Sequence, residues 1–261
     1  MQKKETILDE FFKLENVIYI EKDENGQILS TNNHEIISTY NQILSSNIKD
    51  KNRYYHKQSK TWYKVTENAN ITYLVDVTEF QKEIYYLKRD SLTGFIKDRN
   101  EASKLIEDYI DFAIEENQSF SILAADVDDF KEINDTFGHD CGDLVLKLIS
   151  KIILNSTKHS DDIFDTINND IVLRFGGDEF LILLKNVTLD ETQKKINEIS
   201  TKISNGCFLY DNKPVSVSIS IGYSHFLDSG NCNKPSNEIR KVLSKNADNS
   251  LYQKKKTKNR S

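Results

Sequence analysis

Three acidic residues, Asp126, Asp128 and Asp129, directly follow an apolar run. The run predicts a strand over 120–127, so these carboxylates should lie at one edge of a sheet. A carboxylate in that position is costly unless it is paired, hydrated or bound to a cation. Because aspartate also closes turns and caps helices through side-chain hydrogen bonds, this segment taken alone favours a local structural role.

A second acidic pair, Asp178 and Glu179, follows Gly176 and Gly177 between two apolar runs. Gly-Gly between two strands is an ordinary hairpin signal, but two acids directly after it are less ordinary. Mg²⁺ prefers oxygen ligands, commonly one or two carboxylates together with substrate phosphates. If the strand ending at Asp126 lies beside this hairpin, Asp126 and Asp178 converge on a two-metal site for phosphoryl or nucleotidyl transfer.

Residues suited to binding a nucleotide lie between the two acidic segments: Lys131, Asn134, His139 and Asp143. A lysine supplies positive charge for phosphate. An amide and a carboxylate together offer the donor and acceptors that match the edge of guanine. Taken singly, each of these residues is more often a hydrated surface residue.

An α/β pattern from residue 90 onward must position these side chains. Asp98-x-x-Glu101 resembles a capping box and opens a helix whose apolar stripe runs from Ala102 to Ala113. Gly138 and Gly142 predict a break between two helices. Further strands are predicted over 171–175, 180–184 and 215–223, and further helices over 130–137, 144–152, 196–203 and 239–252.

Residues 1–77 predict a small α+β module with one helix over 34–46 and β-like runs over 17–20, 27–29, 62–65 and 71–75. The turn from Asp23 to Gly26 predicts a hairpin between the first two runs. A helical linker over 78–89 follows. Its apolar stripe starts one residue before the linker and consists of Val77, Phe80, Ile84 and Leu87. This stripe fits either a dimerising coiled coil or a plain connector helix.

Composition excludes several classes of protein. Hydrophobic residues make up 38% and charged residues 29%, which is typical of a globular chain, and a net charge of −6 gives no broad attraction to nucleic acid. Cys141, Cys207 and Cys232 form no CxxC pair, which argues against a disulfide framework or zinc site. No apolar run approaches the roughly 20 residues of a membrane span. We therefore expect a cytoplasmic protein.

Five blocks, in order, resemble the GGDEF domain of diguanylate cyclases. They are DSLTGFIKDRN (90–100), DVDDFKEINDTFGHDCGD (126–143), RFGGDEF (174–180), VSISIGYS (217–224) and ADNSLYQKK (247–255). Together they are highly specific, whereas the RFGGDEF block alone would be moderate evidence. The resemblance implies an α+β fold over 90–261, like nucleotidyl cyclases and polymerase palm domains, with a central, mostly antiparallel sheet and flanking helices.

The resemblance also implies an activity: condensation of two GTP molecules into cyclic di-GMP and two pyrophosphates, with Mg²⁺ or Mn²⁺. The implied metal ligands are Asp126, Asp178 and the backbone carbonyl of Val127. The implied catalytic residues are Asp178, often assigned to deprotonating the attacking 3′-hydroxyl, with Glu179 and Lys131. The implied substrate-binding residues are Asn134, His139, Asp143, Lys255, Phe130, Gly176 and Gly177. Because each domain holds one GTP, catalysis implies a homodimer.

Two motifs depart from the family pattern. The product-inhibition motif Arg-x-x-Asp is replaced by Ile167-Asn168-Asn169-Asp170, so the acid is present and the arginine is missing. Without the guanidinium the bidentate contact is lost, and we expect weak feedback inhibition by that route. In the C-terminal phosphate-binding motif, Lys255 is kept but Asn259 occupies the arginine position, which leaves open whether Arg260 replaces it.

Residues 1–77 resemble, more weakly, a PAS sensory domain, mainly in their exit sequence Asp76-Val77-Thr78-Glu79. PAS domains often precede GGDEF domains, so an unknown ligand or partner is expected to act on this module. His34 and His56 could bind haem in principle, but surface histidines are the ordinary interpretation, and no ligand is predicted.

The sequence supports three other functions less well. A catalytically weak GGDEF module could act as a GTP-binding or scaffolding regulator, but such modules usually lose the acids that Asp178 and Glu179 retain here. A cyclase could make a mixed or adenine product, but Asp143 favours guanine, whose N1 and N2 hydrogens a carboxylate accepts. A metal-dependent phosphodiesterase would need more His and Asp ligands than the sequence offers.

Overall fold

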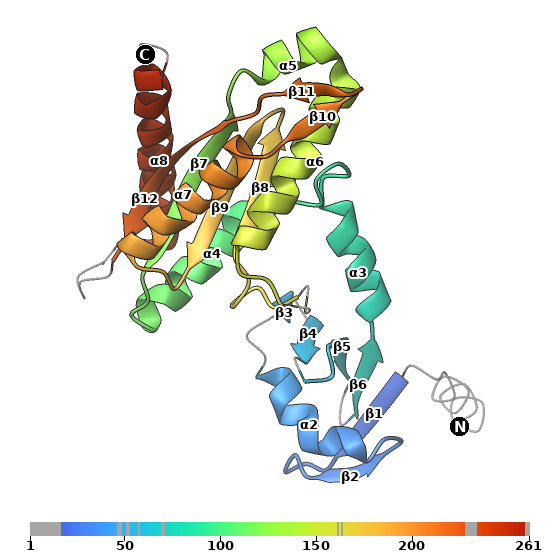
Figure 1. The fold of residues 1–261 in the computed structure, drawn as a ribbon. Coiled ribbons are helices and arrows are strands. Elements are labelled where there is room, and N and C mark those ends of the chain that lie inside the picture. The colour runs from blue at the N-terminus through green and yellow to red at the C-terminus, as the bar shows by residue number, and fades with distance from the viewer. Residues whose placement is uncertain are drawn as a thin grey trace. The chain divides into compact units, whose positions relative to one another are not determined.

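The computed structural model describes residues 17–45, 49–50, 53–56, 58–68, 71–160, 162, 164–227 and 234–258. These residues form two compact units, which are described separately (Figure 1). The first comprises the described residues within Met1–Leu87 together with those within Asp162–Asp165. The second comprises those within Lys88–Asp161 and Thr166–Ser261.

The first unit is an antiparallel sheet of six strands in the order β2-β1-β6-β5-β4-β3. Helix α2 (Glu35–Leu44) contributes Ile36, Tyr40 and Ile43 to its core. The predicted hairpin turn is confirmed, since the Gly26 N–H donates to Asp23 O at 3.0 Å. The strands are β1 (Val17–Lys22), β2 (Ile28–Thr31), β3 (Lys49–Asp50), β4 (Arg53–His56), β5 (Thr61–Asn68) and β6 (Ile71–Asp76). The sequence analysis missed β3 and β4, because both strands are short and neither contains an apolar run. The resemblance to a PAS domain remains a prediction.

Helix α3 (Thr78–Leu87) follows β6, as predicted. Its apolar stripe is divided between two environments. Val77, just before the helix, packs against an aromatic cluster that includes Tyr55 and Trp62, whereas Phe80 and Leu87 are 54% and 73% exposed. The first unit therefore covers only part of the stripe, and a dimerising role for α3 remains a prediction.

The second unit is built on a four-stranded antiparallel sheet in the order β12-β7-β9-β8. Its strands are β7 (Phe120–Val127), β8 (Ile171–Gly176), β9 (Glu179–Lys185) and β12 (Ile219–Phe226). The predicted strand over 215–223 was partly wrong. Val215 ends a separate hairpin of β10 (Phe208–Tyr210) and β11 (Lys213–Val215), and β12 begins only at Ile219. The alternation of residue types continues through this break, so periodicity alone could not locate it.

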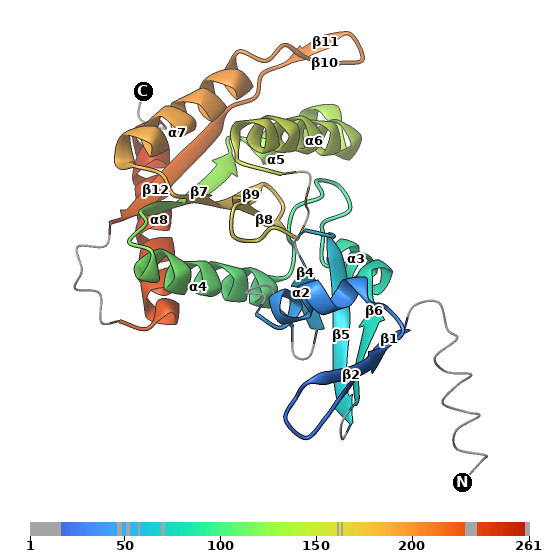
Figure 2. The same cartoon turned by 90° about the horizontal axis from the view of Figure 1, so that it is seen from below.

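Helices cover both faces of this sheet, as Figure 2 shows from below. Helices α4 (Arg99–Glu115) and α8 (Ser236–Lys258) pack on one face, and α5 (Phe130–Phe137), α6 (His139–Ser156) and α7 (Leu189–Ser204) on the other. Successive residues of β7 point to opposite faces, so Ile122 joins the first core and Leu123 the second. The predicted cap of α4 is present, since Asp98 accepts a hydrogen bond from the Glu101 N–H at 2.8 Å. These findings confirm the predicted fold class.

The predicted break between two helices lies at Gly138 alone, whose φ is +87°. Gly142 was predicted to take part in this break, but it lies inside α6 and is buried. A single glycine is tolerated within a helix at a modest cost, so its presence there points to a packing reason.

The backbone of α8 approaches the sheet closely at Gly222 in β12. A Cβ atom there would lie 2.1 Å from the Leu251 nitrogen and 2.3 Å from the Ala247 oxygen. Gly222 pairs with Ala124 of β7, so two small residues lie side by side beneath the helix. This close approach fixes how far the C-terminal turns of α8 lie from the strand that ends at Asp126.

We predict that Gly222→Ala lowers the free energy of unfolding by about 2–4 kcal/mol, because the new methyl group meets backbone atoms that cannot rotate away. Urea denaturation followed by circular dichroism measures the change. Asn249→Ala, which truncates an exposed side chain of α8, should stay within about 0.5 kcal/mol of the wild type. Equal stability of Gly222→Ala and the wild type would contradict the close packing.

Candidate active site

The strand end at Asp126 and the Gly-Gly turn lie side by side. Asp126 pairs with Glu179 on β9 and with Ser220 on β12. The N–H of Val127 donates to the backbone oxygen of Asp178 at 3.2 Å. The arrangement that the sequence analysis required, a strand ending beside the hairpin, is therefore present, and it brings Asp126, Asp178 and Glu179 together.

The turn itself needs both of its glycines. Gly176 and Gly177 have φ angles of +121° and +61°, which side chains rarely adopt. Arg174 holds the turn in place. Its Nε and Nη2 donate to Gly177 O at 3.0 and 2.8 Å, and its Nη1 donates to Asp90 Oδ1 at 2.8 Å. One guanidinium therefore ties the turn that carries Asp178 to the segment that opens the second unit.

Asp90 is the carboxylate that Arg174 binds in the first segment of the second unit. Its Oδ1 also accepts hydrogen bonds from the N–H and the hydroxyl of Thr93, at 2.9 and 2.6 Å. Burial disfavours the charged carboxylate, but the bonds from Thr93 and Arg174 outweigh burial and lower the pKa of Asp90. The sequence analysis included Asp90 and Arg174 only as parts of two separate blocks.

Asp126 has an incomplete set of partners. Its side chain is 15% exposed, and the Lys255 ammonium lies against Oδ1 as an ion pair. The same buried oxygen accepts no hydrogen bond of ordinary geometry from any described residue. Burial raises the pKa of Asp126, the charges of Asp178 and Glu179 add to that shift, and Lys255 opposes it. A buried carboxylate oxygen that lacks a well-placed donor and lies beside other acids is suited to a cation.

The donor set fits Mg²⁺ better than a transition metal. Within the described residues, no group of three or more His, Cys, Asp or Glu side chains is arranged to hold a metal ion. Mg²⁺ does not need such a cage, because it usually takes one or two carboxylates and completes its shell with phosphate and water. Asp126, Asp178 and a backbone carbonyl match that pattern.

Asp128, two residues along, has the opposite environment. Its side chain is 7% exposed, and it accepts hydrogen bonds from Ser218 at 2.7 Å, Ser220 at 2.5 Å and Lys258 at 2.6 Å. Burial opposes the charge, but these three donors lower the pKa of Asp128. Asp128 therefore has the structural role that the segment alone favoured, and it fixes the last turn of α8 to β12.

Helix α5 begins directly after this segment. Asp129 precedes it with a φ of +52°, a left-handed conformation that aspartate tolerates better than most residues. The first N–H groups of α5 are free of intrahelical partners by position, and Lys131 is exposed in the first turn. This end of α5 offers donors and one positive charge to an anion.

The predicted base-binding residues lie where α5 and α6 meet. Asn134 of α5 packs against Gly142 of α6, and Asp143 is the next residue along α6. His139 is exposed at the first position of α6. Asn134 therefore lies close to Gly142, the residue before Asp143. Asn259 and Arg260, the doubtful part of the phosphate-binding motif, lie outside the described residues.

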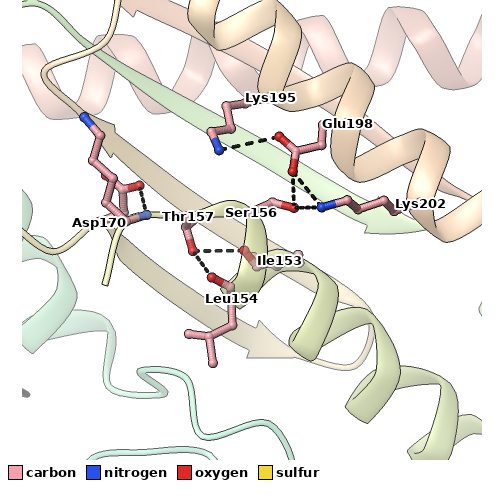
Figure 3. A network of polar contacts seen from close by, with 9 residues as sticks. Ile153, Leu154, Ser156, Thr157, Asp170, Lys195, Glu198 and Lys202 are labelled. Carbon is pink, nitrogen blue, oxygen red and sulfur yellow. Dashed lines mark hydrogen bonds and ion pairs between the residues drawn. The ribbon is translucent and has the colours of Figure 1, made fainter. Parts of the chain in front are cut away.

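The acid of the altered product-inhibition motif is buried, and both of its oxygens have partners. Asp170 Oδ2 accepts from the Lys158 N–H at 2.7 Å, and Oδ1 accepts from the Lys185 N–H at 2.9 Å. Figure 3 shows Asp170 beside the end of α6, where Ser156 donates to Glu198 of α7 at 3.1 Å. Asp170 therefore supports the loop between α6 and β8.

The sequence analysis did not single out Asp248, a further acid near the candidate site. Asp248 of α8 lies close enough to Glu179 for that charge to contribute to its pKa. Burial is the larger cause, and both effects raise the pKa of Asp248. The block ADNSLYQKK contained this residue, but only the packing of α8 on the sheet relates it to the Gly-Gly turn.

A family model described as "Diguanylate cyclase, GGDEF domain" matches residues 87–261. Among curated proteins, Diguanylate cyclase A of Treponema denticola is 34% identical over 142 residues, which are 54% of this chain and 34% of that protein. An uncharacterized membrane protein of Staphylococcus haemolyticus is 35% identical over 156 residues, 56% of this chain and 38% of that protein. The chain thus matches little more than a third of the length of these relatives.

Solved structures support the same fold. The GGDEF domain of the Pseudomonas aeruginosa protein TpbB, also named YfiN, is similar with a TM-score of 0.53 and 28% identity. The similarity covers 65% of this chain and 89% of that domain. The antiparallel sheet with its flanking helices is therefore the architecture of a known domain.

The predicted cytoplasmic location was wrong by this comparison. Relatives from Staphylococcus haemolyticus and Staphylococcus aureus, each 35% identical, are named membrane proteins. Among the helices that the structure describes, none is both long and apolar enough to span a bilayer. Composition and cysteine usage describe this chain and carry no information on the parts of these relatives that it does not match.

We predict that Asp90→Asn destabilises the protein by about 1.5 kcal/mol near neutral pH, because it removes the charge that Arg174 and Thr93 bind. The folded-state pKa of Asp90 lies below 3.8, so its contribution is fully present above pH 3.8 and is lost as the pH falls through the lowered value. Urea denaturation between pH 7 and pH 3 measures the difference from the wild type.

The matched control is Asp111→Asn, at an exposed position of α4, which should change stability by less than about 0.5 kcal/mol. A difference for Asp90→Asn that stays constant down to the lowest pH would show that charge is not what Arg174 binds.

Proposed function

Because this chain belongs to the GGDEF family of diguanylate cyclases, we propose that it condenses two GTP molecules into cyclic di-GMP and releases two pyrophosphates. The observation that carries the proposal is the environment of Asp126. Its buried Oδ1 lacks a hydrogen bond of ordinary geometry, and it lies beside the turn that presents Asp178 and Glu179. A catalytic site for a polyanionic substrate needs such a place for a cation.

The residues that would hold Mg²⁺, or Mn²⁺, are Asp126, Asp178 and the backbone carbonyl of Val127. The bound ion would neutralise charge on the triphosphate and ease the departure of pyrophosphate. In this structure Lys255 neutralises Asp126. With Asp126 as a metal ligand, the Lys255 ammonium would be free to bind a phosphate oxygen, within the reach of one flexible side chain.

The nucleotide would lie along the start of α5. The first N–H groups of that helix and Lys131 would bind phosphate oxygens, and Lys131 would stabilise the charge that develops in the transition state. Asn134 and Asp143 would bind the guanine edge, with His139, Phe130 and the two turn glycines also contacting the substrate. The exposure of Lys131, His139 and Asp143 supports this arrangement, because a ligand can reach them.

The chemical step would be a displacement at phosphorus. Asp178 would take the proton of a 3′-hydroxyl, whose oxygen then bonds to the α-phosphorus of the second GTP as the bond to pyrophosphate breaks. Glu179 would support the same site. A repetition with the roles exchanged closes the ring. Two copies of the chain must therefore face each other, since each domain holds one GTP.

The first unit would regulate this reaction as a sensory module. The exposed apolar side chains of α3, Phe80 and Leu87, support a pairing of this helix with its copy. We propose the division into a sensory domain at 1–77, a helical linker at 78–89 and a cyclase domain at 90–261.

We predict that the purified protein, supplied with GTP and Mg²⁺, forms cyclic di-GMP and pyrophosphate, and that Asp178→Asn lowers turnover at least about 100-fold because it removes a ligand and a base. Chromatography of the nucleotides and a pyrophosphate assay measure both products. Glu116→Gln, which changes a carboxylate at the exposed C-terminal end of α4, should retain activity.

Two outcomes would contradict the catalytic proposal. Wild-type turnover by Asp178→Asn would remove that residue from the mechanism. Binding of GTP by the wild type without pyrophosphate release, under dimerising conditions, would favour a GTP-binding regulator instead.

We predict that added cyclic di-GMP inhibits the reaction weakly. Ile167 replaces the guanidinium that would bind the product, and both oxygens of Asp170 accept backbone hydrogen bonds. Initial rates at rising product concentration measure the effect. Inhibition at submicromolar product would reveal a different inhibitory site.

A further inference from the structure

Gly142 leaves a space that the side chain of Asn134 occupies. A Cβ atom built on Gly142 would lie 2.0 Å from Asn134 Oδ1 and 3.0 Å from Asn134 Cγ. The Phe130 ring closes the space from another side, with Cζ 3.2 Å from the same point. The Asn134 amide therefore lies directly over the backbone of α6, in a volume that any other residue at position 142 would fill.

The backbone conformation of α6 does not require glycine at position 142. Gly142 lies in the interior of α6, and its φ is outside the left-handed region, so the backbone would accept alanine. Alanine is the better helix former, and glycine in a helix interior is unfavourable by comparison. The reason for glycine must come from packing, and the contact with Asn134 supplies one.

We propose that Gly142 is a specificity-determining position, because its missing side chain lets the Asn134 amide lie against α6 beside Asp143. This inference rests on the proposed function, in which Asn134 and Asp143 bind the base. Gly142 is a positioning residue in that scheme, since it acts on the nucleotide through Asn134, the side chain closest to it. A methyl group at 142 displaces the end of a flexible side chain, so it moves the amide without unfolding the helix.

The consequence falls on base selection more than on phosphate binding. The proposed triphosphate contacts come from the side chains of Lys131 and Lys255 and from backbone N–H groups at the start of α5. The three atoms nearest to a Cβ at Gly142 belong instead to the side chains of Asn134 and Phe130. Displacing one amide from a base edge removes a hydrogen bond made only with the matching base. The affinity for the guanine nucleotide should therefore fall about tenfold, while the affinity for an adenine nucleotide stays nearly constant.

The test is a double-mutant cycle of Gly142→Ala and Asn134→Ala on the full chain. The probes are α,β-methylene GTP and α,β-methylene ATP, whose α–β bridge cannot be cleaved, and isothermal titration calorimetry with Mg²⁺ measures both affinities. Gly142→Ala should lower the preference for the guanine probe about tenfold, as should Asn134→Ala. The double variant should be no worse than Asn134→Ala alone.

Gly206→Ala is the matched control, because a Cβ there is also crowded, 2.8 Å from the ring of Phe208, but meets no residue assigned to the base. It should keep the wild-type preference. Thermal unfolding of each variant separates positioning from stability. The melting temperature of Gly142→Ala should not fall, and if it does, the additional Asn134→Ala change should restore it by removing the crowded amide.

The outcomes separate this inference from the proposed function. If the wild type binds neither probe, the proposed function fails and this inference with it. If the wild type prefers the guanine probe and Gly142→Ala keeps that preference, only the inference fails. It also fails if Gly142→Ala lowers the preference further when Asn134 is already alanine, or if a lowered melting temperature is not restored in the double variant.

Discussion

The site depends on one unfavourable placement, a carboxylate that is buried at a strand end with an oxygen that lacks a well-formed hydrogen bond. Removing a charged group from water costs several kcal/mol, of the order that a whole domain has in net stability, unless a partner offsets it. At Asp126 that partner is Lys255, on a helix more than a hundred residues along the chain. The pairing requires α8 to lie close to the sheet, and the contact of Gly222 with the backbone of that helix provides the closeness.

The Gly-Gly turn is held by few contacts. Its left-handed glycines supply a shape, and Arg174 fixes that shape through the carbonyl of Gly177. Because the third contact of Arg174 goes to Asp90, the turn and the first residues of the second unit share one guanidinium. A displacement at Asp90 would therefore be felt at the turn through a single rigid group.

Sequence reasoning predicted most of the architecture of the second unit, because β7, β8 and β9 are long apolar runs and α4 and α7 have clear helical stripes. It failed where the decisive feature was tertiary. The residues 216–218 leave the ladder although their alternation continues, and Gly142 was assigned to a break although it packs inside a helix. The β10–β11 hairpin and strands β3 and β4 were missed because each is too short or polar to carry a period. Each of these features is set by tertiary packing and strand pairing, not by residue type alone.

Residue type alone does not distinguish a structural aspartate from a metal ligand. Asp126, Asp128 and Asp170 are chemically identical in the sequence, and they differ in the hydrogen bonds that each accepts in the fold. Both oxygens of Asp170 accept backbone N–H groups, and Asp128 accepts three side-chain donors, so each is already satisfied within the fold. Asp126 alone among the three has a buried oxygen without a well-placed donor among the described residues. Several donors fixed by the fold hold Asp128 and Asp170, whereas the buried Oδ1 of Asp126 is paired with the ammonium of one flexible side chain, Lys255. This difference supports Asp126 as the centre of the proposed site.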